Sequence, residues 1–249
     1  MKKILFLGYR SCDLFYFLNR RSEMFQTEEK LTLQQIEEIS PDLIISFGYK
    51  YIIKKPIIER YKNRIINLHI SYLPWNRGAS PNVWSFVEKT PKGVSIHLID
   101  EGIDTGDILF QKTVFLKSNH TLKQSYNILL KEVQDLFMEK WKIIESLQFS
   151  GTKQNLAEGS YHTKEDTEKY LQKLGITSWE TEVGELIMRS DEDIINDIQE
   201  IRAKNNTHWM DLVKLAFEVA PTKSRSIFKK IKFCDEKVNE LLKELADND

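Results

Sequence analysis

Cysteine is scarce in this chain of 249 residues, which contains only Cys12 and Cys234. The two lie far apart and lack metal-ligand spacing, so we expect neither a disulfide framework nor a structural zinc site. Long apolar runs are missing as well. The apolar segment after Lys2 and Lys3 is too short for a signal peptide, and no later run approaches membrane-spanning length. We therefore expect a cytoplasmic protein without a bound metal or a membrane partner.

An excess of either charge is also missing. The chain has 36 Lys and Arg against 37 Asp and Glu, a formal net charge of -1. Such a balance gives no general attraction to nucleic acid, so no nucleic-acid partner is expected. The hydrophobic fraction of 41% over this length predicts one large buried core with an appendage.

Short apolar segments alternate with amphipathic ones along the first 150 residues. Thr32 and Gln35 have capping-box spacing, Asp13 could cap a helix beginning at Leu14, and Ser80 precedes a proline suited to a first helical turn. Strands are expected at 4–7, 43–47 and 65–69, a hairpin at 94–98 and 108–114, and a long helix at 121–147. This alternation predicts an α/β fold with a doubly wound, mostly parallel sheet.

The pattern changes after residue 150. Beyond a polar stretch the sequence becomes helical in period, with Val238, Leu241 and Leu242 on one face. We therefore predict a catalytic domain over 1–150 and a mainly helical carboxy-terminal region over 151–249.

Ligands in doubly wound sheets bind at the carboxyl ends of the strands. The ends after Leu7, Phe47 and His69 should therefore meet at one crevice. The loop from Gly8 to Asp13 contains no second glycine, so it lacks the fingerprint of dinucleotide binding. A nicotinamide cofactor is not expected there.

Polar residues converge at the end of the third predicted strand. Asn67 and His69 are two residues apart, so both side chains lie on one face of the strand. The acidic, glycine-rich loop 100–107 can bring a carboxylate to the histidine, and Asp100, Asp104 and Asp107 compete for that position. An amide, an imidazole and a carboxylate together suit acyl transfer.

Two motifs carry a family resemblance. Asn67-x-His69-x-Ser71-x-Leu73-Pro74-x-x-Arg77-Gly78, followed by Gly102-x-Asp104-Thr-Gly106-Asp107, resembles the folate-dependent formyltransferases, which include methionyl-tRNA and glycinamide ribonucleotide formyltransferases. The detailed forms between residues 46 and 112 look most like the sugar N-formyltransferases. The resemblance implies a Rossmann-like formyltransferase fold, and it weakens beyond about residue 154.

The resemblance also implies the reaction. Enzymes of this type move a formyl group from 10-formyltetrahydrofolate to the amine of a nucleotide-linked amino sugar, here expected to be dTDP-4-amino-4,6-dideoxyglucose for O-antigen and lipopolysaccharide biosynthesis. Asn67, His69 and Asp104 match the family's catalytic positions. Asn67 would donate to the oxyanion, His69 would stabilise that oxyanion or move protons, and Asp104 would orient the imidazole.

Contacts to the two substrates are expected from loops at the strand ends. The nucleotide sugar is assigned to Arg10, Ser11, Asp13, Tyr49 and Lys50, although Asp13 fits equally well as a helix cap and Lys50 as a solvated surface residue. Folate is assigned to Tyr51, Ile52, Ile53, Gly102 and Ile103. His97 and His120 are interpreted as structural histidines.

Other functions stay open. A methionyl-tRNA formyltransferase is the nearest enzyme alternative, but the carboxy-terminal region lacks the predominantly basic balance of an RNA-binding extension. A non-enzymatic binding module on the same fold is a third reading, and an intact set of Asn67, His69 and Asp104 argues against it. The sequence leaves a homodimer open.

Overall fold

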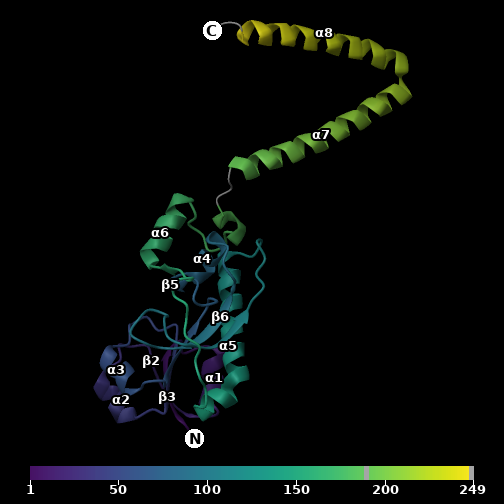
Figure 1. Ribbon diagram of the computed structural model, residues 1–249. Helices are drawn as coiled ribbons and strands as arrows, with labels where there is room; N and C mark the ends of the chain where they lie inside the picture. Colours follow the sequence, from purple (N-terminus) through teal and green to yellow (C-terminus); the bar gives the residue numbers. More distant parts are fainter. Residues whose placement is uncertain (188–190, 247–249) are drawn as a thin grey trace. The chain divides into compact units, whose positions relative to one another are not determined.

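The computed structural model describes residues 1–187 and 191–246, without the side chains of 191–198, 204, 245 and 246. Contacts between residues divide the chain into two compact units, Met1–Ile187 and Met188–Asp249. The first holds the sheet and the second holds two long helices (Figure 1).

A six-stranded sheet organises the first unit. Its strands are β1 (Lys3–Gly8), β2 (Glu23–Thr27), β3 (Leu43–Phe47), β4 (Ile65–His69), β6 (Gly93–Leu98) and β7 (Ile108–Thr113). They lie in the order β2-β1-β3-β4-β6-β7. The pairs β1·β2, β1·β3 and β3·β4 are parallel, whereas β4·β6 and β6·β7 are antiparallel. The predicted fold class and the hairpin are confirmed, and β2 is a strand that the sequence patterns did not indicate.

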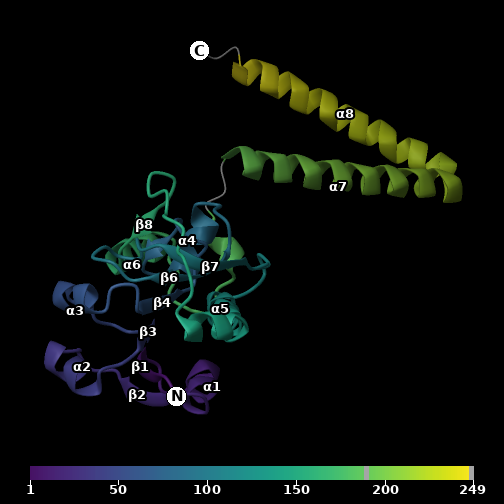
Figure 2. The same cartoon turned by 60° about the horizontal axis from the view of Figure 1, so that its bottom comes forward.

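Helices cover both faces of the sheet. Alternate residues of β1 point to opposite sides, and because residues 4–7 are all apolar, both faces of the sheet bury side chains. Ile4 and Phe6 belong to the larger core cluster, and Leu5 and Leu7 belong to the smaller one. The larger cluster includes buried residues of α1 (Asp13–Asn19), α4 (Pro81–Val87) and α5 (Leu122–Ser146). The smaller includes residues of α2 (Leu33–Ile39) and α3 (Lys55–Arg60). Figure 2 shows this arrangement from a second direction.

The observed N-terminal caps of the helices agree only in part with those predicted from the sequence. Thr32 and Gln35 form the expected capping box of α2. Asp13 is not the cap of α1, because the thiol of Cys12 accepts from the Phe15 amide at 3.4 Å and Asp13 is the first helical residue. Ser80 is the N-cap of α4, but its side chain makes no capping bond. There the fixed φ of proline favours the first turn without a side-chain cap.

Residues 151–187 are part of the first unit. β8 (Tyr161–His162) pairs in parallel with β5 (Arg77–Gly78), and α6 (Lys164–Lys173) and the 3-10 helix η1 (Val183–Leu186) follow. The His162 ring stacks on Trp84 with centroids 3.7 Å apart, and its Nε2 lies 2.6 Å from Glu88 Oε1. The domain division after residue 150 stays a prediction, while the contacts of the first unit extend to Ile187.

The second unit consists of α7 (Asp191–Val219) and α8 (Pro221–Ala246). The expected helical character of the carboxy-terminal region is confirmed. Within the described residues, none of the helices has the length and apolar character needed to span a membrane.

Candidate active site

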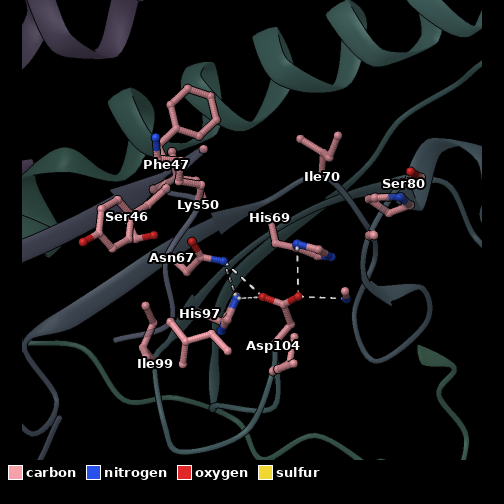
Figure 3. Close-up of a pocket in the computed structure, with 18 of the residues that line it drawn as sticks. Ser46, Phe47, Lys50, Asn67, His69, Ile70, Ser80, His97, Ile99 and Asp104 are labelled. Carbon is pink, nitrogen blue, oxygen red and sulfur yellow. Dashed lines mark hydrogen bonds and ion pairs between the residues drawn. The ribbon is translucent and has the colours of Figure 1, made fainter. Parts of the chain in front are cut away.

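Three polar side chains meet beyond the carboxyl end of β4 (Figure 3). Asn67 and His69 project from β4 to the same side, and Asp104 comes from the loop between β6 and β7. Asp104 Oδ1 accepts from Asn67 Nδ2 at 3.2 Å, and Asp104 Oδ2 lies 3.6 Å from His69 Nδ1. The residues singled out by the two sequence motifs therefore form one constellation.

Local backbone geometry holds Asp104 in place. The residue has a φ of 54°, in the left-handed region that non-glycine residues seldom adopt. Its Oδ2 accepts from the Gly78 amide at 2.9 Å, and its carbonyl accepts from Gln154 Nε2 at 2.9 Å. The strained carboxylate loop is thus fixed by the Arg77–Gly78 turn and by the segment after residue 150.

Electrostatics favour an ionised aspartate beside a neutral imidazole. Burial on its own would raise the pKa of Asp104, but the neighbouring His69 and His97 and the Gly78 amide outweigh burial and lower the pKa well below its usual value. Burial lowers the pKa of His69 below 6.5, against the opposing effect of Asp104. The site therefore offers a proton acceptor and a fixed negative charge at neutral pH.

His97 completes the constellation, although the sequence led us to interpret it as structural. The β4·β6 register places it opposite Asn67. Its Nδ1 donates to the Leu98 carbonyl at 2.7 Å, and its Nε2 lies 3.1 Å from Asn67 Nδ2 and 3.4 Å from Asp104 Oδ1. The amide nitrogen of Asn67 therefore faces both His97 and Asp104.

Neither competing aspartate faces His69, although Asp100 also lines the cavity described below. Asp100 Oδ1 accepts from the Gly102 amide at 3.0 Å and from Thr105 Oγ1 at 2.6 Å, which shapes the acidic loop. Asp107 is absent from the described lining of the cavity. Of the three carboxylates, Asp104 is the one that faces His69.

The constellation opens into a cavity of about 640 Å³. Among the residues assigned to substrates, the cavity is lined by Tyr49, Lys50, Tyr51, Ile52, Ile53, Gly102 and Ile103. Arg10, Ser11 and Asp13 are not among its lining residues, and Arg10 Nε lies 3.8 Å from Glu28 Oε1. The Tyr49 hydroxyl donates to the Glu29 carbonyl and accepts from the Leu31 amide, both at 2.8 Å, so it anchors its own loop.

An aromatic wall was not foreseen from the sequence. Tyr9, Tyr126 and Trp179 line the cavity from three distant segments. The hydroxyls of Tyr9 and Tyr126 are 3.1 Å apart, and the rings of Tyr126 and Trp179 meet edge to face with centroids 5.6 Å apart. Of these three residues, only Tyr9 could have been found from the sequence, because it follows the first predicted strand directly, where ligands bind in this type of sheet.

A metal centre is not evident in the part of the chain that the structure describes. No group of three or more His, Cys, Asp or Glu side chains there is arranged to hold an ion.

The profile described as "Formyl transferase" matches residues 14–140. The chain belongs to the formyl transferase family. Among solved structures, the formyltransferase PseJ from Anoxybacillus kamchatkensis is 47% identical, with a TM-score of 0.70 over 74% of this chain and 97% of that chain. It was solved with UDP-4,6-dideoxy-4-formamido-L-AltNAc and tetrahydrofolate. A 4-N formyltransferase from Francisella tularensis is 24% identical with a TM-score of 0.53 over 68% and 79% of the two chains, which shows the fold alone.

Curated relatives of this family member share only part of their length with it. Methionyl-tRNA formyltransferase from Finegoldia magna is 37% identical over 114 residues, which is 45% of this chain and 36% of that protein. The enzyme of the same name from Clostridium perfringens strain 13 is 33% identical over 134 residues, or 43% of its length. The chain therefore spans less than half of the length of these two relatives.

Proposed function

We propose that this formyltransferase moves the formyl group of 10-formyltetrahydrofolate to the amine of a nucleotide-linked amino sugar. The observation that carries the proposal is the 47% identical relative, which is covered over 97% of its length and was solved with a formamido sugar nucleotide and tetrahydrofolate. The open cavity at Asn67, His69 and Asp104 supports it, because it offers an amide, a neutral imidazole and a carboxylate at one wall.

In the proposed reaction the neutral amine attacks the formyl carbon. A carbon–nitrogen bond forms, the carbonyl oxygen becomes an oxyanion, and the bond from that carbon to the folate nitrogen then breaks. One proton leaves the amine and one reaches the folate nitrogen, so the transfer is balanced. His69 Nε2 lies 3.2 Å from the Asn76 carbonyl, which accepts its hydrogen, so Nδ1 is the nitrogen of the neutral ring that can accept the amine proton. The adjacent Asp104 charge stabilises the imidazolium that forms.

Asn67 is proposed as the donor to the oxyanion. Since the Asn67 amide nitrogen lies 3.1 Å from His97 Nε2 and donates to Asp104 Oδ1 at 3.2 Å, one of these two contacts must give way when the substrate binds. Catalytic hydrogen bonds commonly tighten only in the substrate complex, so this exchange is compatible with the role. A preorganised donor of this kind contributes roughly 100- to 1,000-fold in rate.

Both substrates are assigned to residues that line the cavity. We assign folate to Tyr51, Ile52, Ile53, Gly102 and Ile103, where exposed Ile52 and Ile103 offer apolar surface to a pterin ring. The sugar nucleotide is assigned to the aromatic wall of Tyr9, Tyr126 and Trp179, with Lys50 as the cation for its phosphates.

For the sugar itself, a UDP-linked 4-amino-4,6-dideoxy-L-AltNAc is the first candidate. It is the amine from which the product bound to the 47% identical relative would be made. The neighbours solved with dTDP compounds are 22% and 23% identical and support the fold alone. The dTDP-linked 4-amino-4,6-dideoxyglucose and a role in surface polysaccharide synthesis remain predictions.

A panel assay tests the proposal. The purified full chain is incubated with 10-formyltetrahydrofolate and, separately, UDP-linked and dTDP-linked 4-amino sugars or initiator methionyl-tRNA, and products are weighed by mass spectrometry. We expect one added formyl group on the UDP-linked 4-amino sugar. Transfer only to methionyl-tRNA would replace the proposal with the tRNA enzyme, and transfer to none would reject both.

A further inference from the structure

The hairpin of α7 and α8 leaves most of its apolar side chains in water. Contacts between the two helices gather at their turn, where the rings of Phe217 and Phe228 have centroids 5.4 Å apart and Ser224 Oγ donates to the Ala216 and Ala220 carbonyls. Ser224 is the single buried residue among the described side chains of both helices. An apolar set of this size on a helix indicates a partner surface.

A heptad repeat runs along α8, with polar Ser224 at its first position and apolar side chains after it. Spacings of three and four alternate strictly through Ser224, Ile227, Ile231, Cys234, Val238 and Leu241. This spacing forms a straight seam for a second helix in a left-handed coiled coil. Ile231, Val238 and Leu241 are 43%, 52% and 63% exposed, so α7 does not cover the seam. Figure 1 shows α7 and α8 as two long helices joined at one turn.

The uneven distribution of charge along α8 favours a second copy of the same helix as its partner. Residues 223–232 contain five basic and no acidic side chains, whereas residues 233–244 contain four acidic and two basic ones. A parallel pair of such helices would set the basic halves against each other. An antiparallel pair of identical helices can set the basic segment 228–232 of each helix against residues 240–244 of the other, which include Glu240 and Glu244, and it is closed by a two-fold axis.

We propose that α8 pairs antiparallel with α8 of a second copy of this chain. In this register Ser224 stays at the turn between α7 and α8 of its own chain. Ile231 lies opposite Leu241 of the second copy, and Cys234 lies opposite Val238 of the second copy. The same register brings Phe228 to Leu242 and Lys230 to Glu244 of the second copy, an apolar flank and a charged flank. The repeat of α7 is a weaker seam, since polar Asn205 and His208 interrupt it.

The share of the chain that aligns with the 47% identical relative is consistent with a catalytic first unit and a second unit that serves dimerisation. That alignment covers 74% of 249 residues, about 184, against the 187 residues of the first unit. The relative is itself covered to 97%. An added unit of two helices can therefore serve assembly without supplying the reaction site.

Light scattering of the full chain tests the pairing. We expect a dimer of twice 29.4 kDa at micromolar concentration. Leu241→Glu should weaken the dimer by about 30-fold or more, because it buries a charge in the seam. Asn239→Glu adds the same charge to the same helix on the face away from the seam, and it should leave the dimer intact. A monomeric wild type, or a Leu241→Glu variant that dimerises normally, would overturn the proposal.

Two further experiments test whether the two α8 helices pair antiparallel. Lys230→Glu should weaken the dimer, and adding Glu244→Lys should restore it only in the antiparallel register. In a Cys234→Ser background, separately purified Ile231→Cys and Leu241→Cys proteins should form a mixed disulfide on mixing, because seam partners lie within disulfide reach. Self-linked products alone would indicate a parallel pair and reject the arrangement. A monomer that sediments with phosphatidylserine vesicles would identify α8 as a membrane-binding helix instead.

Discussion

Replacing Asp104 by asparagine should disable the enzyme while preserving its shape. In the structure Oδ1 faces the Asn67 amide at 3.2 Å and Oδ2 faces the Gly78 amide at 2.9 Å, and both partners are donors. An asparagine side chain offers one acceptor and one donor. Either orientation of its amide therefore sets a donor against a donor, and one buried N–H loses its partner.

This geometry sets the size of the loss in stability and of the loss in turnover. Leaving a buried donor unpaired costs about 1–3 kcal/mol of the free energy of unfolding, which corresponds to roughly 2–12 °C in Tm for a chain of this size. Loss of the charge beside His69 should lower kcat at least about 100-fold, since a positioned proton-transfer system contributes roughly 100- to 10,000-fold. Initial rates of formylation and thermal melts measure the two effects separately.

The pH dependence of stability gives a second readout. The folded-state pKa of Asp104 lies below its ordinary value of 3.8, so its contribution is complete above that value and is lost as pH falls through the folded-state pKa. Unfolding in urea should therefore separate wild type from Asp104→Asn at pH 7, and the difference should narrow below pH 4.

Asp107→Asn is the matched control, because Asp107 lies in the same loop and does not line the cavity. It should retain near-wild-type turnover. An active Asp104→Asn enzyme within about threefold of wild type would refute the reasoning, because a proton-transfer role requires a far larger loss.

Four further results are expected. Lys50→Ala should raise KM for the nucleotide sugar about 5- to 20-fold with little change for folate, as steady-state kinetics would measure, because a phosphate contact supports ground and transition states alike. His97→Ala should lower kcat about 10- to 100-fold with KM nearly unchanged, since it removes a contact that positions the Asn67 amide, and unchanged kcat would assign His97 to the core alone. Nitrogen-15 NMR should find His69 mostly neutral at pH 6.5, and the native fold should lose stability as pH drops through 6.5 because the unfolded chain takes up the proton first. Dialysis against a chelator should leave the rate unchanged, and loss restored by one divalent ion would contradict a metal-free site.

The fold was predictable where local pattern and packing agree. Short, mainly apolar runs predicted β1, β3 and β4, and α5 begins after Thr121, as the predicted helix 121–147 requires. β2 was missed because its five residues are exposed or only partly buried, so they show no apolar run. At α1 the sequence offers Cys12 and Asp13 side by side, and which one caps the helix is decided by where the backbone turns.

The candidate site was predictable only along single elements. Strand alternation placed Asn67 and His69 on one face, whereas the position of His97 depends on the β4·β6 register, which no local pattern specifies. The aromatic wall depends on contacts between residues more than a hundred positions apart, such as Tyr9 and Tyr126. Arg10 follows the first strand as a ligand residue would, yet its charge lies near Glu28.

The parallel pairing of Arg77–Gly78 with Tyr161–His162 sets the shortest fragment that can keep the site intact. The Gly78 amide holds Asp104, Gly78 itself is paired with β8, and Gln154 donates to the Asp104 and Gly106 carbonyls, so residues past 150 stabilise the loop that carries the carboxylate. A fragment ending at residue 150 would expose Trp84 and release that loop. One ending at Ile187 retains every contact described around Asp104, and it is the natural starting point for engineering a minimal version of this transferase.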